Sequence, residues 1–303
     1  MTRPALAVTL QRIRPRRDAD RGGRYLVPLL VVMGLTSLYP AAYSIYMSFF
    51  DWDWGHRFNF VGLTNYTSLL GSERFNTALL NTFVFTVSAV AIELSLGLGL
   101  ALAVHRLRRG VGVFRTLLLV PLMVSGITVS VIWKILLDPT LGIVNYGLHA
   151  LGVGSIGFLG DSGMAMASIV MIDVWWQTAF VFIVLLAGLS AIPQEPLEAA
   201  EVDGASTLQR LRFVTLPLLK PIILVVLLFR TIDCMKVFAI IFGTTGGGPL
   251  TTTESVQILA YRVAFKQLNM SQSMTMMVVF SVIVLAIVLI YVRYGRSSED
   301  GAG

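Results

Sequence analysis

The chain has 303 residues, of which 55% are hydrophobic and only 13% are charged, and its mean hydropathy is +0.77. Because soluble domains carry about 25% charged residues, most of this chain is expected to lie in lipid. The single cysteine, Cys234, excludes an internal disulfide framework, and with three histidines far apart in the sequence we expect no metal site. The net charge of +6 does not indicate a nucleic-acid partner, because the basic residues stand at the ends of apolar runs, as membrane topology requires.

Six apolar segments approach the length that a bilayer-spanning helix needs, about 20 residues. In chain order they are residues 26–50, 78–104, 116–133, 164–192, 221–243 and 271–292. The first carries no charge and is longer than the apolar core of a cleaved signal peptide, about 7–15 residues, so we interpret it as a retained membrane helix. The sequence therefore predicts an all-α membrane protein with about six transmembrane helices.

The distribution of lysine and arginine predicts the orientation of these helices. With a cytoplasmic N-terminus, sixteen basic residues fall on the inner side and five on the outer side, which is a clear positive-inside bias. We therefore predict a basic cytoplasmic N-terminal tail (1–24), a six-helix transmembrane domain (25–293) and a cytoplasmic C-terminal tail (294–303), with both termini inside. Among the outer connections, a short interfacial helix is expected near residues 142–151.

One inner connection, residues 193–220, differs from the others because it is polar yet patterned for helix. Residues 197–200 form helix readily and are acidic early, which suits a helix N-terminus. Gly204 then interrupts the pattern, and a second short amphipathic helix is expected over residues 206–214, ended by Pro217. The segment therefore predicts a compact helix–turn–helix on the cytoplasmic side.

This segment resembles the EAA loop of permease subunits in binding-protein-dependent, ATP-driven (ABC) importers. The family pattern is Glu-Ala-Ala, three residues, Gly, nine residues, then Ile-x-Leu-Pro. The chain matches it at each position except for valine in place of isoleucine. The resemblance implies the fold of type I ABC importer permeases, in which this loop is a coupling helix that docks on a cytoplasmic ATPase. The residues to which it assigns coupling are Glu198, Ala199, Ala200, Asp203, Gly204, Leu216 and Pro217.

Further short motifs along most of the chain are similar to the carbohydrate branch of that family, which includes maltose-type and glycerol-phosphate importers. The resemblance implies a multi-pass protein of the bacterial inner membrane. It also implies a sugar-like solute, a second permease subunit, usually a different one, two ATPase subunits and an extracytoplasmic solute-binding protein. The chain lacks a GxxxxGK[ST] phosphate loop. We therefore expect no catalytic residue and no bound cofactor here, with ATP and Mg²⁺ held by the partner ATPase.

Charged residues inside the predicted spans are candidates for function, because a charge at the bilayer centre costs about 2.5–3.5 kcal/mol on insertion scales. Arg230, Asp233 and Lys236 are spaced by three and are expected on one helix stripe, either as a structural ion-pair triad or lining the transport path. Similarity to the maltose-type permease adds positions in the fourth span. The candidate substrate-path residues are Asp173, Gln177, Thr178, Phe180, Val181, Arg230 and Asp233.

A second class of transporter stays open from the sequence. An ion-coupled secondary carrier could use the intramembrane acids Glu93, Asp173 or Asp233 as its coupling site. Such carriers often contain inverted repeats, and we see no convincing internal repeat in this sequence. Glu93 is otherwise interpreted as a hydrogen-bonding group inside the bundle. The identity of the solute cannot be predicted, and disaccharides, monosaccharides, polyols and glycerol phosphate all remain open.

Overall fold

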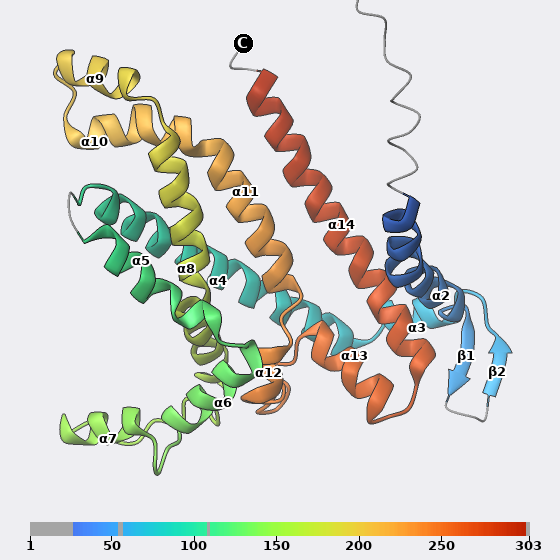
Figure 1. Cartoon of the computed structure of the whole chain (residues 1–303). Helices are drawn as coiled ribbons and strands as arrows, with labels where there is room; N and C mark the ends of the chain where they lie inside the picture. Colours follow the sequence, from blue (N-terminus) through green and yellow to red (C-terminus); the bar gives the residue numbers. More distant parts are fainter. Residues whose placement is uncertain (1–26, 54–56, 108–109, 301–303) are drawn as a thin grey trace, which may run out of the picture.

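The computed structural model describes residues 27–53, 57–107 and 110–300, so the predicted N-terminal tail lies outside the described residues. Among those, five helices are long and apolar enough to cross a membrane, or six if one bent pair counts as a single span. Figure 1 shows the helices as an open bundle with a short β-hairpin at one side. The first helix runs over Val27–Met47, and the remaining bounds, in chain order, are η1 Gly34–Leu38, α2 Tyr39–Met47, β1 Phe50–Asp53, β2 Arg57–Phe60, α3 Thr64–Leu70, α4 Glu73–His105, α5 Val111–Leu119, η2 Pro121–Met123, α6 Gly126–Leu136, α7 Ile143–Ala150, α8 Ala165–Ala191, α9 Gln194–Val202, α10 Thr207–Arg210, η3 Leu211–Thr215, α11 Leu216–Met235, α12 Ala239–Gly243, α13 Val256–Phe265 and α14 Met270–Asp300.

Helices α4, α8 and α11 form the centre of the bundle. Helices α4 and α8 approach closely at Gly97, where an added Cβ would lie 2.6 Å from a methyl group of Val181. In lipid, where no hydrophobic force drives helices together, such small residues permit the close packing that holds them. The predicted second and fourth spans are confirmed as α4 and α8.

The third predicted span is not one straight helix. Residues 111–123 and 126–136 form two helical segments that are bent by 93° relative to each other. The cause is local: Pro121 starts the 3₁₀ turn η2, and Ser125 then caps a new helix by accepting a hydrogen bond from the backbone N–H of Thr128. The indole N–H of Trp176 on α8 donates to the carbonyl of Val124, 3.1 Å away, at the break itself.

The fifth predicted span has different ends from those expected. Pro217 does not end the preceding helix, because the wide π-turn η3 makes room before it and the chain is helical from Thr207 to Met235. The helix then stops at Met235, although neither Gly nor Pro lies at residues 236–238. The carbonyl of Val237 at this break accepts a hydrogen bond from the Ser255 hydroxyl, 3.1 Å away, so tertiary contacts complete the ending.

The connections between the spans contain ordered structure, part of which the sequence did not predict. The unpredicted part is a β-hairpin. Strands β1 and β2 pair antiparallel, with Phe50 opposite Phe60, and the backbone N–H of Trp52 donates to the Ser271 hydroxyl at the start of α14. The short helix expected near residues 142–151 is confirmed as α7.

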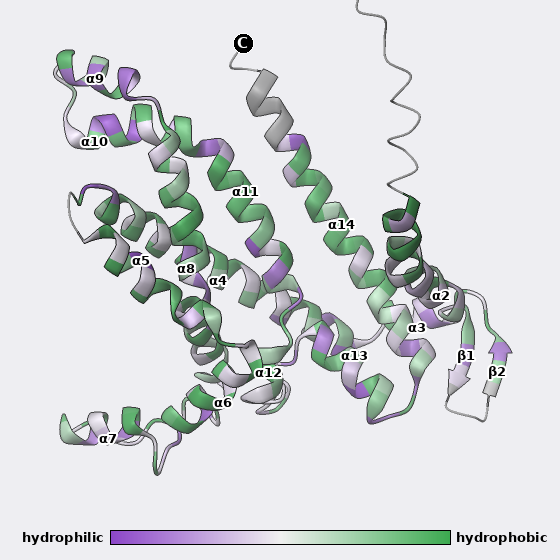
Figure 2. Cartoon of the chain, in the orientation of Figure 1, coloured by the Kyte–Doolittle hydropathy of each residue, from purple (hydrophilic) through white to green (hydrophobic). Residues whose placement is uncertain are grey.

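The two ends of the bundle differ in character. In Figure 1, α9 and α10 lie at the same end as the C-terminus of α14, whereas α7, α12 and α13 lie at the opposite end. Figure 2 shows apolar residues along α11 and α14 and polar residues concentrated on α9 and α10. Helix α14 continues to Asp300, so most of the predicted C-terminal tail is helical and extends beyond the apolar segment.

Candidate functional site

The first candidate site is the elbow formed by α9, residues 203–206 and α10. Gly204 has a φ of +76°, in the left-handed region that favours glycine. Its N–H bonds to the carbonyl of Glu201, and the N–H of Ala205 bonds to the carbonyl of Ala200, both at 3.0 Å. This is the Schellman arrangement that ends a helix and reverses the chain. The glycine of the EAA pattern therefore falls where the backbone requires it.

The second arm of the elbow is fixed equally well. Ser206 and Gln209 form a capping box, in which each side chain accepts a hydrogen bond from the other residue's backbone N–H. Across the turn, the guanidinium of Arg210 donates to the carboxylate of Glu201 at 2.6 Å. These contacts hold α9 and α10 in one geometry, and the predicted helix–turn–helix is confirmed.

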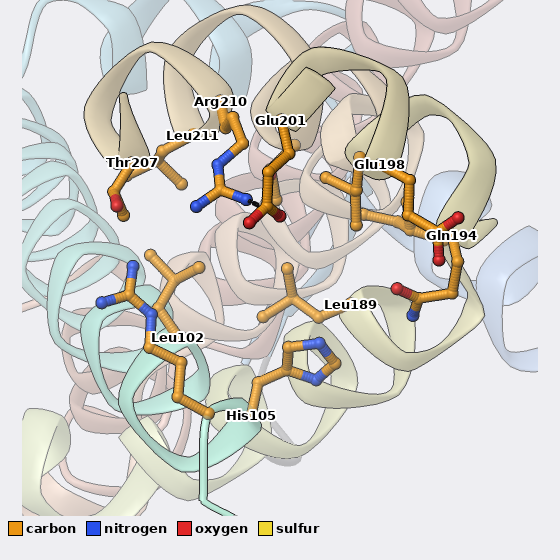
Figure 3. Close-up of a pocket in the computed structure, with 13 residues that line it drawn as sticks. Leu102, His105, Leu189, Gln194, Glu198, Glu201, Thr207, Arg210 and Leu211 are labelled. Atoms are coloured by element: carbon orange, nitrogen blue, oxygen red, sulfur yellow. Dashed lines mark hydrogen bonds and ion pairs between the residues drawn. The ribbon is translucent and has the colours of Figure 1, made fainter. Parts of the chain in front are cut away.

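The elbow presents a mixed surface. The exposed apolar side chains are Val202 and Leu208 on the elbow and Phe213 in η3, directly after it. The acid Glu198 is also exposed, and it forms no ion pair with another described residue. Between the elbow and the ends of α4 and α8 lies a cavity of about 480 Å³ (Figure 3), whose lining includes His105. An ordered, exposed surface of this kind on a polar connection is typical of a contact site for another protein.

The remaining residues of the EAA pattern lie within or beside the elbow. Ala199 is exposed, and its carbonyl accepts a hydrogen bond from the backbone N–H of Asp203, the C-cap residue of α9. Leu216 and Pro217 lie at the start of α11, after the π-turn η3 that follows α10. The structure therefore brings Glu198 to Gly204 together and places Leu216 and Pro217 on the helix that continues from the second arm.

The second candidate site is a buried ion cluster centred on Arg230 of α11. Its guanidinium donates twice to Glu93 of α4, at 2.6 and 2.8 Å, and once to Asp173 of α8, at 2.8 Å. A further bond of 2.5 Å joins it to Asp233, one turn along α11. Arg230 is only 2% exposed, whereas the side chain of Asp233 is 65% exposed. One arginine thus ties three central helices together inside the bundle.

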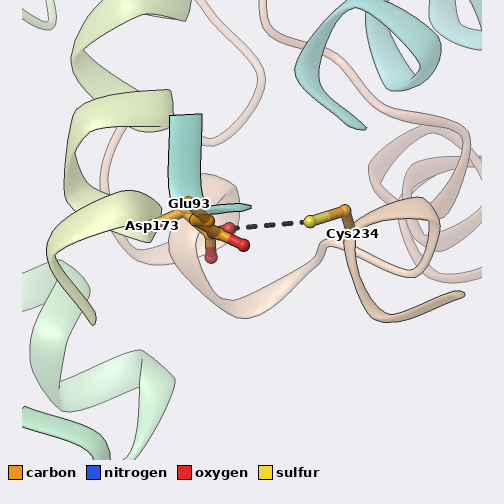
Figure 4. A group of neighbouring side chains, drawn as sticks. All are labelled: Glu93, Asp173 and Cys234. Carbon is orange, nitrogen blue, oxygen red and sulfur yellow. Dashed lines mark hydrogen bonds between the residues drawn. The ribbon is translucent and has the colours of Figure 1, made fainter. Parts of the chain in front are cut away.

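The carboxylates of Glu93 and Asp173 and the thiol of Cys234 approach one another within 4.8 Å (Figure 4), a spacing that could suit a metal ion. However, Arg230 donates to both carboxylates and, at 3.1 Å, to the Cys234 sulfur. The guanidinium therefore occupies the position in which a cation would be held, and the arrangement is that of an ion-pair cluster.

The cluster borders a cavity of about 290 Å³ that several predicted substrate-path residues share. Asp173, Gln177 and Asp233 line it, together with Trp176 and Lys236. The prediction that Lys236 lies on the same helix stripe as Arg230 is wrong, because α11 ends at Met235. Lys236 also forms no ion pair with the described residues. The bundle-interior interpretation of Glu93 is confirmed.

Three predicted substrate-path residues lie elsewhere. The hydroxyl of Thr178 donates to the carbonyl of Val174 within α8, and Val181 is buried against α4 at Gly97. Phe180 packs in the apolar cluster around Phe182 and Leu185. None of the three lines the cavity beside the ion cluster.

Sequence reasoning missed a third charged group at the opposite end of the bundle from the elbow. Glu254 is buried and accepts two hydrogen bonds from Arg74, at 2.8 and 2.9 Å, and one from Arg262. Arg262 also donates to the carbonyl of Gly246, at 2.6 Å. The group fixes the glycine-rich loop between α12 and α13, and its partners lie up to 180 residues apart in the chain, so no local pattern could reveal it.

Comparison with known proteins identifies the family of this chain. Residues 95–296 match the model of the binding-protein-dependent transport system inner membrane component family. The chain belongs to this family. The permease is 36% identical to the trehalose/maltose transport system permease protein MalF of Thermococcus litoralis, covering 94% of this chain and 96% of the relative. It is 32% identical to the sn-glycerol-3-phosphate transport system permease protein UgpA of Agrobacterium fabrum, covering 89% and 92%.

The fold of the permease also matches a solved structure. It superposes with a TM-score of 0.81 on a chain of a bacterial ABC transporter involved in the import of the acidic polysaccharide alginate, with 23% identity, covering 93% of this chain and 96% of that one. The permease therefore has the type I importer fold that the EAA resemblance implied. Family membership also supports the importer over the ion-coupled carrier.

Proposed function

We propose that this permease is one transmembrane half of an ATP-driven importer that moves a sugar or sugar-like solute by alternating access. The observation that carries the proposal is the elbow: a rigid helix–turn–helix that projects from α8 and α11, with an EAA pattern in register with its turn. ATP binding by a separate pair of ATPase subunits would move the elbow, and hydrolysis would reset it. The family membership supports transport that depends on a binding protein.

The chemistry of the elbow suits docking on an ATPase. Glu198 is free to accept charge-assisted hydrogen bonds from a basic group of that partner. The exposed side chains of Val202, Leu208 and Phe213 offer apolar contacts beside it. ATP and Mg²⁺ would be held entirely by the ATPase subunits, since this sequence contains no phosphate-binding loop.

The solute would pass the cavity beside the ion cluster. Carboxylate and amide groups of Asp173, Asp233 and Gln177 can bond to solute hydroxyls, and Trp176 offers an apolar face. The names of the relatives support a solute of the sugar or glycerol-phosphate class. Specificity within that class would rest largely on the extracytoplasmic binding protein.

The assembly would contain a second permease half, two ATPase subunits and the binding protein in the inner membrane. The positive-inside bias supports cytoplasmic termini. The position of the elbow at the same end of the bundle as the C-terminus of α14 supports the same orientation (Figure 1). The outer ends of α12 and α13 would then face the binding protein.

A glycine pair on opposite ends of the bundle gives a controlled test. Gly204→Asp places a charged side chain in a left-handed backbone that favours glycine, at the turn of the proposed docking surface. It should abolish uptake and co-purification of the ATPase while leaving membrane insertion intact. Gly152→Asp is the matched control, because Gly152 has a φ of +77° and open space around it, after α7.

Uptake would be measured in host cells with radiolabelled trehalose, maltose and sn-glycerol 3-phosphate in turn. Co-purification would use an affinity tag on the permease. Normal uptake by the Gly204→Asp variant would remove the coupling role of the elbow. Equal losses in both variants would indicate a general folding defect, which the amount of inserted protein would reveal.

A further inference from the structure

Four aromatic rings form a continuous row at the end of the bundle opposite the elbow. Phe238 and Phe242 stack with ring centroids 5.1 Å apart, and Tyr261 contacts both edge-on, at 5.5 and 5.2 Å. Phe265 extends the row from Tyr261, at 5.2 Å. The rings come from the segment around α12 and from α13, which lie side by side in Figure 1. We call Phe238, Phe242, Tyr261 and Phe265 the aromatic shelf.

Three residues of the shelf, Phe238, Tyr261 and Phe265, line an open groove of about 330 Å³. This volume is at the small end of the range for ligand sites, about 300–1,000 Å³. Gln257, one turn before Tyr261 on α13, lines the same groove. Neither the Gln257 amide nor the Tyr261 hydroxyl hydrogen-bonds to another described residue. Both polar groups therefore remain available beside exposed ring faces.

The groove adjoins the proposed solute path at Phe238. Phe238 lines both this groove and the cavity that contains Asp173, Asp233 and Gln177. The break after α11 places Phe238 between them, because the chain leaves the helix at Lys236 and re-enters it only at Ala239. A solute that enters along this groove would therefore contact the shelf before it reaches the ion cluster.

We infer that the aromatic shelf and Gln257 form an outer carbohydrate subsite, at which one sugar ring stacks before it reaches the cavity beside Arg230. A pyranose ring presents C–H groups on its faces and hydroxyls at its edge. The exposed face of Phe265 matches the former, and the amide of Gln257 matches the latter. A row of rings suits a solute with more than one ring better than a linear one. This inference rests on the proposed function.

The alternative occupant of the groove is an apolar surface of the second permease half or of lipid. Replacing phenylalanine by leucine separates the two cases, because leucine keeps an apolar side chain and removes the flat ring. Phe265→Leu and Tyr261→Leu should weaken binding of a ring sugar about two- to tenfold, whereas Phe265→Tyr should retain it. Phe114→Leu on α5 is the matched control, since Phe114 is 49% exposed and Phe265 is 58% exposed.

The transporter would be purified from its host through a tag on the permease, with its companion subunits, in lipid nanodiscs. Saturation-transfer NMR, with irradiation of the aromatic protons, would detect maltose, trehalose and methyl α-glucoside, with sn-glycerol 3-phosphate as the ringless probe. Transfer to ring C–H groups that falls in Phe265→Leu and persists in Phe114→Leu is the expected result.

Wild-type binding of all three ring sugars in the Phe265→Leu variant, or binding of none of them by the wild type, would overturn the inference. Companion subunits that are lost from the Phe265→Leu preparation would show that the shelf packs against the second half, which also overturns it. The proposed function is tested separately: ATP-driven uptake that survives in Phe265→Leu with unchanged affinity removes only the subsite, whereas wild-type protein without ATP-driven uptake removes both.

Discussion

Removing the central cation of the buried cluster should destabilise the permease strongly. Arg230→Met keeps the length and apolar stem of the side chain but leaves the carboxylates of Glu93 and Asp173 buried without their partner. Breaking a buried ion pair by removing one member costs about 3–5 kcal/mol. The bond to Asp233 adds little to this figure, because the Asp233 side chain is 65% exposed and its pairing is screened by solvent.

A double-mutant cycle isolates the contribution of the pair itself. Glu93→Gln alone should also destabilise, because it replaces a charged acceptor by an amide beside the guanidinium. The Glu93→Gln/Arg230→Met double variant should cost less than the sum of the single variants, by about 1–3 kcal/mol, since the two residues share two hydrogen bonds. An exposed arginine gives the control: Arg115→Met on α5 should change stability by at most about 0.5 kcal/mol.

The assay is unfolding of the purified chain in detergent micelles by a titrated denaturant, followed by tryptophan fluorescence. Trp175 and Trp176 lie on α8, two and three residues from Asp173, and report on the surroundings of the cluster. If Arg230→Met unfolds at the same denaturant concentration as Arg115→Met, or if the cycle is additive, the cluster is not an energetic centre of the bundle and the reasoning fails.

Three further outcomes follow from the contacts around the bundle. Asp233→Ala should lower uptake more than protein abundance, as read by transport and immunoblot on the same membranes, because its exposed carboxylate contributes at most about 1 kcal/mol to stability; parallel losses would favour a structural role. Gly97→Ala should cost about 1–3 kcal/mol in the same unfolding assay, with partial rescue by Val181→Ala, because the new Cβ would lie 2.6 Å from the valine methyl group; an unrescued or negligible loss would argue against tight packing there. Glu254→Gln should speed hydrogen exchange in residues 246–255, since two arginines lose their charged partner; unchanged exchange would show that other contacts fix the loop.

The helices and the elbow could be predicted because their signals are local. An apolar run of sufficient length must lie in lipid, and Gly204 marks a turn that only a left-handed residue completes. The wrong helix ends, by contrast, depend on neighbours. The stop after Met235 is completed by a hydrogen bond from Ser255, and Pro217 is tolerated because the preceding π-turn widens the helix.

The candidate sites were predictable to different degrees. The EAA pattern located the elbow, but its exposed apolar side chains emerge only when both arms are in place. The charges of Asp173, Arg230 and Asp233 marked the region of the second site, yet the sequence could not show that Arg230 bonds to Glu93, 137 residues away. Thr178 does not line that cavity, and its hydroxyl donates to the carbonyl of Val174 within α8.

The uninterrupted helix from Thr207 to Met235 has a mechanical consequence. Its 29 residues, about 44 Å at 1.5 Å per residue, begin in the elbow and pass through Arg230 before they end beside the outer groove. Near the elbow it is pliable, because the π-turn η3 and the missing N–H groups of Pro217 and Pro221 weaken its hydrogen-bond ladder. Beyond Pro221 it is a stiff rod. A displacement of the elbow would therefore bend the helix between Leu211 and Pro221 and tilt the rod beyond it as one body, which would move the Arg230 guanidinium.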